Sequence, residues 1–158
     1  MHLVLTYFDR LKGPSIFMSF PDAKIEEDII NKLIKFFDLD INETFFEIVL
    51  INKQKKIINL YIEIPSDWAR GKKEMVMLSL IMKKEYPSEL VYAFIVETSH
   101  KILKTNNVFK AFYNNDDHYN ENIEVYLAHE QIRIILFDCL SDLISRLESK
   151  IKKKIRRN

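Results

Sequence analysis

The sequence has 158 residues, of which 47% are hydrophobic and 30% charged, with 24 Lys and Arg against 23 Asp and Glu. This length suits one domain, and the composition is typical of a globular chain rather than a disordered or fibrous one. The net charge of +1 predicts no general attraction to nucleic acid. Only two glycines are present, Gly13 and Gly71, which excludes the glycine-rich loops that bind phosphate in nucleotide enzymes.

The cysteine content and the hydropathy pattern bear on the cellular compartment. One cysteine, Cys139, allows no intramolecular disulfide, and the first residues carry no signal-peptide pattern. No apolar stretch reaches ~18 residues without a charge, so we expect no membrane-spanning segment. Together these features predict a cytoplasmic protein.

A hairpin is predicted at the start of the chain. Residues 3–8 are apolar at nearly every position and rich in branched and aromatic types, which suits a strand buried on both faces. The polar run 9–14 ends in Gly13-Pro14, a strong turn pair, and residues 15–20 resume an extended apolar pattern.

The next element is predicted to be an amphipathic helix. Pro21 ends the hairpin, and Asp22 is a candidate helix cap. Apolar residues then recur at helical spacing opposite charged ones. These apolar positions are Ile25, Ile29, Ile30, Leu33, Phe36 and Phe37.

Three further strands are predicted in a meander. Residues 45–51 and 56–64 flank the short polar turn 52–55, which indicates a second hairpin. After the loop 65–73, residues 75–82 are apolar on both faces and are interpreted as the fifth strand.

The last third of the chain is predicted to be mainly helical. A helix is expected over 87–104, and a second, long helix over 122–155. Between them, residues 105–122 contain six asparagines and one short apolar patch, 108–113, and we expect a loop there.

The order of these elements predicts an α+β fold. Hairpins pair strands one with two, three with four and four with five, and the apolar runs place strands one and five at the centre. The result is a five-stranded antiparallel sheet in the order 2-1-5-4-3. The first helix then covers one face of the sheet and the last two helices cover the other.

Two segments resemble the longin domain, a profilin-like module of vesicle-trafficking and small-GTPase regulatory proteins. The first is the hairpin Phe8-Asp9-Arg10-Leu11-Lys12-Gly13-Pro14, followed by Phe17 and Pro21, and it is similar to the first hairpin of archaeal and eukaryotic longin-like proteins. The second is the loop 69–74 that leads into the fifth strand. Asp9, Gly13, Pro14 and Pro21 are the candidate motif residues of the hairpin.

This resemblance implies a non-catalytic adaptor or scaffold. Its expected partner is a small GTPase or another longin or roadblock-type domain. Longin-like domains commonly dimerise by joining sheet edges beside the first helix, so the sheet edge and the first helix are the expected assembly surface. We expect one longin-like domain over residues 1–149 and a basic helix end or tail over 150–158. No cofactor is expected.

Catalytic and metal-binding patterns were weighed as an alternative. His129-Glu130 begins like a zinc-protease helix, but Arg133 stands where the second histidine is required. Other candidates are Asp116-Asp117-His118 as metal ligands and Ser99-His100 or Cys139 with His129 as nucleophile and base. None forms a recognisable set, so an enzyme or small-ligand sensor on a profilin-like scaffold is the second interpretation.

Two candidate interface regions follow from the predicted order. The second strand is an edge strand, and its apolar residues favour pairing with another chain. The loop after the fourth strand holds Trp68 and Arg70, both residue types that are enriched at interface hot spots. The alternative is that Trp68 folds over the end of the sheet while Arg70 is solvated. The candidate interface residues are Ile16, Phe17, Met18, Phe20, Trp68 and Arg70.

The basic C-terminal end is a third candidate surface. Residues 146–157 carry seven Lys or Arg and one Glu, net +6, which leaves the rest of the chain at −5. Such an end suits a weak, salt-sensitive contact with an anionic membrane, and binding to nucleic acid through it is a further alternative. The candidate anionic-surface residues are Lys150, Lys152, Lys153, Lys154, Arg156 and Arg157.

Overall fold

The computed structural model describes residues 1–38 and 45–155, with side chains at 1–37 and 45–150. Its strands are β1 His2–Asp9, β2 Gly13–Phe20, β3 Phe45–Leu50, β4 Lys55–Pro65 and β5 Lys73–Lys83. Its α-helices are α1 Glu27–Lys35, α2 Ser88–Leu103 and α3 Ile123–Ile155. Short 3-10 helices are η1 Phe36–Asp38, η2 Ile51–Lys53, η3 Val108–Tyr113 and η4 Asp117–Tyr119.

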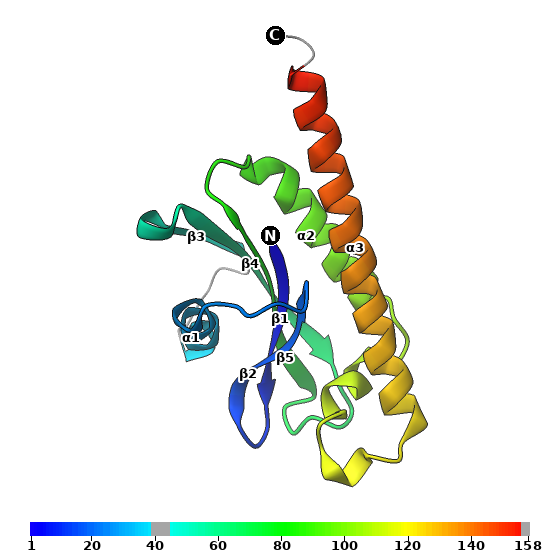
Figure 1. The fold of residues 1–158 in the computed structure, drawn as a ribbon. Coiled ribbons are helices and arrows are strands. Elements are labelled where there is room, and N and C mark those ends of the chain that lie inside the picture. Colours follow the sequence, from blue (N-terminus) through cyan, green and yellow to red (C-terminus); the bar gives the residue numbers. More distant parts are fainter. Residues whose placement is uncertain (39–44, 156–158) are drawn as a thin grey trace.

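The five strands form one antiparallel sheet in the order β2-β1-β5-β4-β3, which confirms the order predicted from the sequence (Figure 1). At the centre, Leu5 of β1 lies opposite Leu78 of β5, and Leu78 lies opposite Leu60 of β4. The two strands with apolar residues on both faces, β1 and β5, are the buried central pair.

Helices cover the two faces of the sheet as expected. Because side chains alternate along a strand, Leu3 and Leu5 join the core beneath α2 and α3, whereas Val4 joins the core beneath α1. Ile29 and Leu33 of α1 are 1% and 0% exposed and complete the smaller core. Figure 1 shows α1 on one side of the sheet and α2 and α3 on the other.

One polar pair lies within the apolar core. Asn59 of β4 and Ser79 of β5 are both fully buried and directly opposite each other. The hydroxyl of Ser79 donates a hydrogen bond of 2.7 Å to the Asn59 side-chain oxygen. Because a buried polar group without a partner is costly, this bond fixes the β4–β5 pairing in one register.

The start of the first helix differs from the sequence prediction. Asp22 does not cap it, because α1 begins at Glu27 and Glu26 precedes it in an extended conformation. The chain between the hairpin and the helix places Ile25 in the smaller core. Burial of this side chain therefore shifts the start of the helix by about one turn.

The segment 105–122 also differs from the prediction of a loop. It contains η3 and η4, and the apolar patch of η3 is buried in the larger core beneath α3. Apolar side chains in a tight 3-10 turn carry no helical or strand periodicity, so burial is not visible in the pattern. The buried residues are Val108, Phe109, Ala111, Phe112 and Tyr113.

The last helix is one continuous element of 33 residues. One side of it packs on the rest of the fold through a stripe that includes Val125, Ile132, Leu136, Leu143 and Leu147. The helix runs through the boundary between 149 and 150 that the sequence suggested, so no change of secondary structure marks that position. Figure 1 shows its C-terminal part extending past the sheet.

Candidate interaction surface

The β1–β2 turn is organised by one carboxylate. Asp9 accepts hydrogen bonds from the backbone amides of Leu11 at 2.8 Å and Lys12 at 2.9 Å, and from the hydroxyl of Tyr7 at 2.7 Å. Burial raises the pKa of the Asp9 carboxyl, but the bonds from Tyr7 and the two amides outweigh it and lower the pKa overall. Gly13 adopts φ +76°, a conformation that favours glycine. These contacts explain why Asp9 and Gly13 stand in this turn.

The β4–β5 loop is held by a buried serine. The hydroxyl of Ser66 accepts a hydrogen bond from the amide of Ala69 at 3.1 Å and donates one to Glu74 at 2.6 Å. The amide of Ser66 also donates to the carbonyl of Lys72, and the amide of Lys72 to the carbonyl of Ala69, both at 3.0 Å. The loop is therefore a closed, compact unit that presents Arg70 and Gly71 at its tip.

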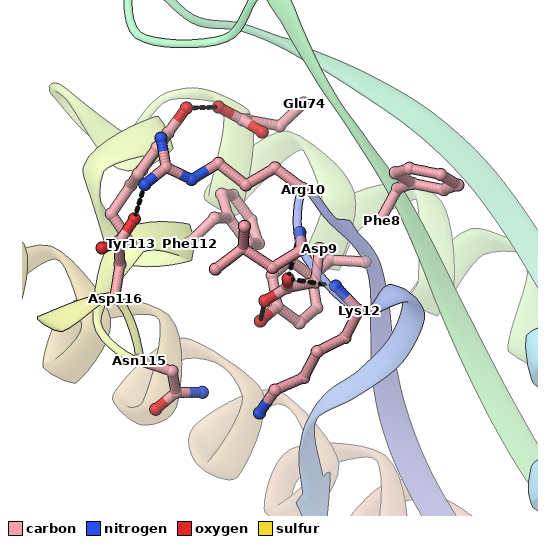
Figure 2. Close-up of a pocket in the computed structure, with 11 residues that line it drawn as sticks. Phe8, Asp9, Arg10, Lys12, Glu74, Phe112, Tyr113, Asn115 and Asp116 are labelled. Atoms are coloured by element: carbon pink, nitrogen blue, oxygen red, sulfur yellow. Dashed lines mark hydrogen bonds and ion pairs between the residues drawn. The ribbon is translucent and has the colours of Figure 1, made fainter.

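Tyr113 of η3 joins the turn to the loop. Its hydroxyl donates a hydrogen bond of 2.9 Å to Glu74 at the start of β5. The guanidinium of Arg10 lies 5.9 Å from the centre of the Tyr113 ring and forms an ion pair with Asp116. Figure 2 shows Arg10, Tyr113, Glu74 and Asp116 converging in this way. The two segments that resemble longin domains, the hairpin turn at 8–14 and the loop at 69–74, thus meet at one end of the sheet.

Trp68 is part of the same aromatic cluster. Its ring stacks on Tyr119 at 4.6 Å and meets the edges of Phe109 at 5.5 Å and Tyr113 at 5.1 Å. The interpretation in which Trp68 folds over the end of the sheet is confirmed, because these rings cover much of it. Trp68 anchors the loop to η3 and η4, while Arg70 is exposed.

A recess of about 580 Å³ opens between the turn and the loop. We call it the sheet-end recess, and the residues that define it are Phe8, Arg10, Trp68, Arg70, Lys73 and Tyr113. At its border Phe8 is 39% exposed, and in the adjoining turn Leu11 is 79% exposed. Apolar and aromatic surface therefore lies beside cationic side chains in one place.

The charged side chains around the recess differ in how far they are engaged by other groups of the protein. The carboxylate of the recess is Glu74, and its Oε1 atom accepts hydrogen bonds from the hydroxyls of both Ser66 and Tyr113. Arg70 is exposed at the loop tip, and Lys73 pairs with Glu63 at 2.6 Å. Such a site suits an acidic group that stands next to an apolar or aromatic group.

The second strand does not present the uncovered apolar face that the sequence predicts. A bulge in the β1–β2 pairing places Leu5 opposite Met18 and Thr6 opposite Ile16, which leaves Phe17 as the extra residue. Phe17 then packs against Tyr7, Phe112 and His129, with ring centres 4.9 to 5.4 Å apart.

The remaining candidate side chains of β2 are buried or partly buried. Met18 is buried in the larger core, Ile16 packs on the smaller one, and the Phe20 ring lies 6.2 Å from that of Phe137. The prediction is therefore wrong about the side chains. The backbone of β2 is nevertheless an edge of the described sheet, and its pairing with another chain stays a prediction.

The sequence reasoning missed a second apolar stripe on α3. Large hydrophobic side chains lie on the side of the helix opposite its packed stripe, and they are 38% to 64% exposed. We call this surface the α3 outer face: Ile123, Tyr126, Leu127, Ile134, Phe137 and Ile144. A search for a second series at three- and four-residue spacing would have found it, because 123, 127, 134, 137 and 144 share one side of a helix.

The basic end is described only in part. Lys150 is exposed, and the helix backbone continues to Ile155. The side chains of Lys152, Lys153 and Lys154, and all of Arg156 and Arg157, lie outside the described residues. Membrane or nucleic-acid contact through them stays a prediction.

The candidate catalytic groups are placed apart and in ordinary contacts. Cys139 is buried, with its sulfur 3.7 Å from the Lys101 amine, and the Ser99 hydroxyl donates to the Val96 carbonyl. His129 lies 3.6 Å from Glu130, and its burial lowers the pKa of its imidazole. In the part of the chain that the structure describes, no three His, Cys, Asp or Glu side chains gather in a way that could hold a metal ion.

Comparison with known proteins adds no relative. No family model matches the sequence, and no curated protein matches it. Within residues 1–38 and 45–155, no helix is both long and apolar enough to cross a membrane.

Proposed function

We propose that this protein is a non-catalytic adaptor domain that binds a protein partner at the sheet-end recess. The observation that carries the proposal is the meeting of the Asp9–Gly13 turn and the Trp68–Arg70 loop around Tyr113. The two segments are at least 55 residues apart in the chain, yet each is held by its own hydrogen bonds and both border one recess.

The composition of this surface favours a protein partner. Interface hot spots are rich in aromatic residues and arginine, and they lie where apolar contacts exclude water from polar ones. Leu11 and Phe8 supply the exposed apolar contacts, and Arg10 and Arg70 supply the cationic ones. A partner segment with an acidic side chain next to an apolar one matches this arrangement.

The resemblance to longin domains suggests which partners to test first. Those domains act with small GTPases and with related longin or roadblock domains in trafficking-like regulation. The hairpin segment 8–14, which carries the strongest part of the resemblance, supplies one side of the recess. Small GTPases are therefore the first partners that we propose.

A pull-down tests this proposal. The purified chain is immobilised and exposed to a panel of small GTPases loaded with GDP or with a GTP analogue. We expect retention of at least one GTPase, at least a tenfold loss of retention with Arg70→Glu, and no loss with Lys32→Glu. Lys32 is an exposed residue of α1 on the opposite side of the sheet, so its charge reversal is a matched control. Circular dichroism confirms that each variant is folded.

Two results would contradict the proposal. Equal retention by the wild type and Arg70→Glu would show that the partner uses another surface. Absence of retention in both nucleotide states would contradict the GTPase as partner, and the same column exposed to purified longin and roadblock domains would then test the remaining class.

The volume of the recess supports a second candidate function. Small-molecule sites occupy roughly 300–1,000 Å³, and about 580 Å³ is available here beside Arg10 and Arg70. The chain would then be a sensor of a small anionic ligand. Thermal shift with inorganic phosphate, citrate and a nucleoside triphosphate tests it: a stabilisation that Arg70→Glu abolishes supports the sensor, and no stabilisation by any of the three contradicts it.

A further inference from the structure

The α3 outer face exposes six large hydrophobic side chains on one side of a single helix. Ile123 and Phe137 are 64% and 56% exposed, and Ile134 is 50% exposed. An aromatic side chain has ~150–250 Å² of surface and Ile and Leu have less, so the six half-exposed residues present on the order of 500 Å² of apolar surface, within the range of the largest patch on a monomer. The ring of Phe20 at the edge of the sheet borders Phe137, so the apolar surface reaches β2.

Four residues of the face, Leu127, Ile134, Phe137 and Ile144, have the same spacing in both directions along the helix. If two copies of α3 lie antiparallel, with the symmetry axis between positions 135 and 136, Ile134 faces Phe137 of the second copy. In the same register Leu127 faces Ile144, and Glu130 faces Ser141. These four apolar residues therefore meet one another and the two polar positions meet each other, whereas Ile123 and Tyr126, nearer one end of the face, lie opposite Glu148 and Ser145.

Area and charge favour the same pairing. A stable interface needs ~800 Å² from each partner, which the apolar face and its polar border supply together. The antiparallel register also places Glu130 of one copy opposite Ser141 of the second copy rather than opposite a second Glu130. A parallel pair would place like charges side by side, which is unfavourable.

We propose that the α3 outer face binds a second copy of this chain, with the two α3 helices antiparallel and Ile134 of one copy against Phe137 of the other. This surface is distinct from the sheet-end recess, and the proposal does not depend on the proposed function. It also differs from the β2 edge pairing expected from the sequence, because the contacts come from side chains of a helix.

The oligomeric state of the full chain tests the proposal. Sedimentation equilibrium from ~1 to 200 µM is expected to show a dimer with a dissociation constant at or below tens of micromolar, roughly the range of weak association. Ile134→Glu is expected to raise that constant at least tenfold. Ile51→Glu is the matched control, because Ile51 is 69% exposed and lies in η2, away from α3.

Three results would overturn the proposal. A monomer at every concentration would do so, as would a dimer that survives Ile134→Glu. A monomer that pellets with anionic vesicles, and fails to pellet when Ile134 is replaced by Glu, would assign the face to lipid instead. Circular dichroism of both variants shows whether the fold is retained, and Ile134→Ser is the milder replacement if Ile134→Glu does not fold.

Disulfide trapping tests the orientation. Glu130→Cys and Ser141→Cys are prepared separately in a Cys139→Ala background, one with a tag that changes its mass, and are mixed and oxidised. The antiparallel register predicts mainly the mixed disulfide between positions 130 and 141. Homodisulfides alone would contradict the antiparallel arrangement.

Discussion

The hydroxyl of Tyr113 donates a hydrogen bond to the carboxylate of Glu74 over 2.9 Å, although 39 positions separate them in the chain. This bond fastens η3 to the start of β5, at the point where the recess forms. Burial raises the pKa of the Tyr113 hydroxyl, and the bond to Glu74 raises it further. The tyrosine is therefore held as a neutral donor.

Removal of that hydrogen bond is expected to destabilise the protein. Tyr113→Phe should lower the free energy of unfolding by about 1 kcal/mol, because the partly buried Glu74 carboxylate loses one of its two hydroxyl donors. Glu74→Gln should lower the free energy of unfolding by less in the Tyr113→Phe background than in the wild type. Urea unfolding of the wild type, the two single variants and the double variant gives the coupling free energy between the two side chains. Tyr126→Phe is the control, because Tyr126 is exposed. Additive effects would contradict a direct interaction.

The sheet was predictable because its signals are local. Residues 3–8 and 75–82 are apolar on both faces, and short polar turns link the remaining strands to them, so only a few topologies are consistent. Because both faces of the central strands are apolar, helices must cover both faces of the sheet, the first helix on one face and the last two on the other. This is why the strand order follows from the sequence before any contact is known.

The site was not predictable in the same way, because its contacts are long-range. Nothing local in the sequence shows that Tyr113 joins Arg10 to Glu74, or that rings from η3 and η4 cover Trp68. The bulge that turns Phe17 toward the core is likewise set by pairing with β1 rather than by its own neighbours. Asn-rich composition suggested a loop over 105–122, and burial of Phe112 overrode it.

Trp68 provides a fluorescence signal for the sheet end, because it is the only tryptophan. Tyr119→Ala removes its stacked neighbour and should shift the native emission to longer wavelength, with a loss of ~0.5–1.5 kcal/mol in the free energy of unfolding. Tyr92→Ala removes a ring from α2 and should leave the emission unchanged. An unaltered spectrum in Tyr119→Ala would contradict the described packing.

Acid is expected to weaken the contact between α1 and the β3–β4 turn. Hydrogen bonds from Lys53 and then Lys55 lower the pKa of Glu26 to about 2 from 4.5. Because the pKa is lower in the folded state, the stabilisation is complete above pH 4.5 and is lost as the pH falls toward 2. The difference in Tm between the wild type and Glu26→Gln should therefore be present at pH 7 and vanish near pH 2.

Salt provides the control for that prediction. Glu26 is exposed, so high salt should screen its ion pairs and reduce the same Tm difference at pH 7. Glu27→Gln, the exposed neighbour on the first turn of α1, is the matched variant. A Tm difference for Glu26→Gln that is constant from pH 7 to pH 2 would show that the ion pairs are not its source.

The basic end is expected to bind anionic vesicles weakly. Each cation close to an anionic surface adds ~1 kcal/mol, and salt screens this attraction. In vesicle sedimentation, the full chain should pellet more than a chain that ends at Ser149 at low salt, and the difference should shrink at physiological salt. Equal pelleting of the two forms at low salt would show that the end has no membrane role.

The most direct test of the proposed function is to map where a small GTPase binds. Amide resonances of the ¹⁵N-labelled chain are recorded with and without the GTPases of the panel, each loaded with GDP or a GTP analogue. We predict perturbations at Phe8, Leu11, Arg70 and Gly71, with Ile29 and Leu33 of α1 unchanged. Perturbations confined to α1 and β3, or none with any GTPase in either state, would contradict binding at the sheet-end recess.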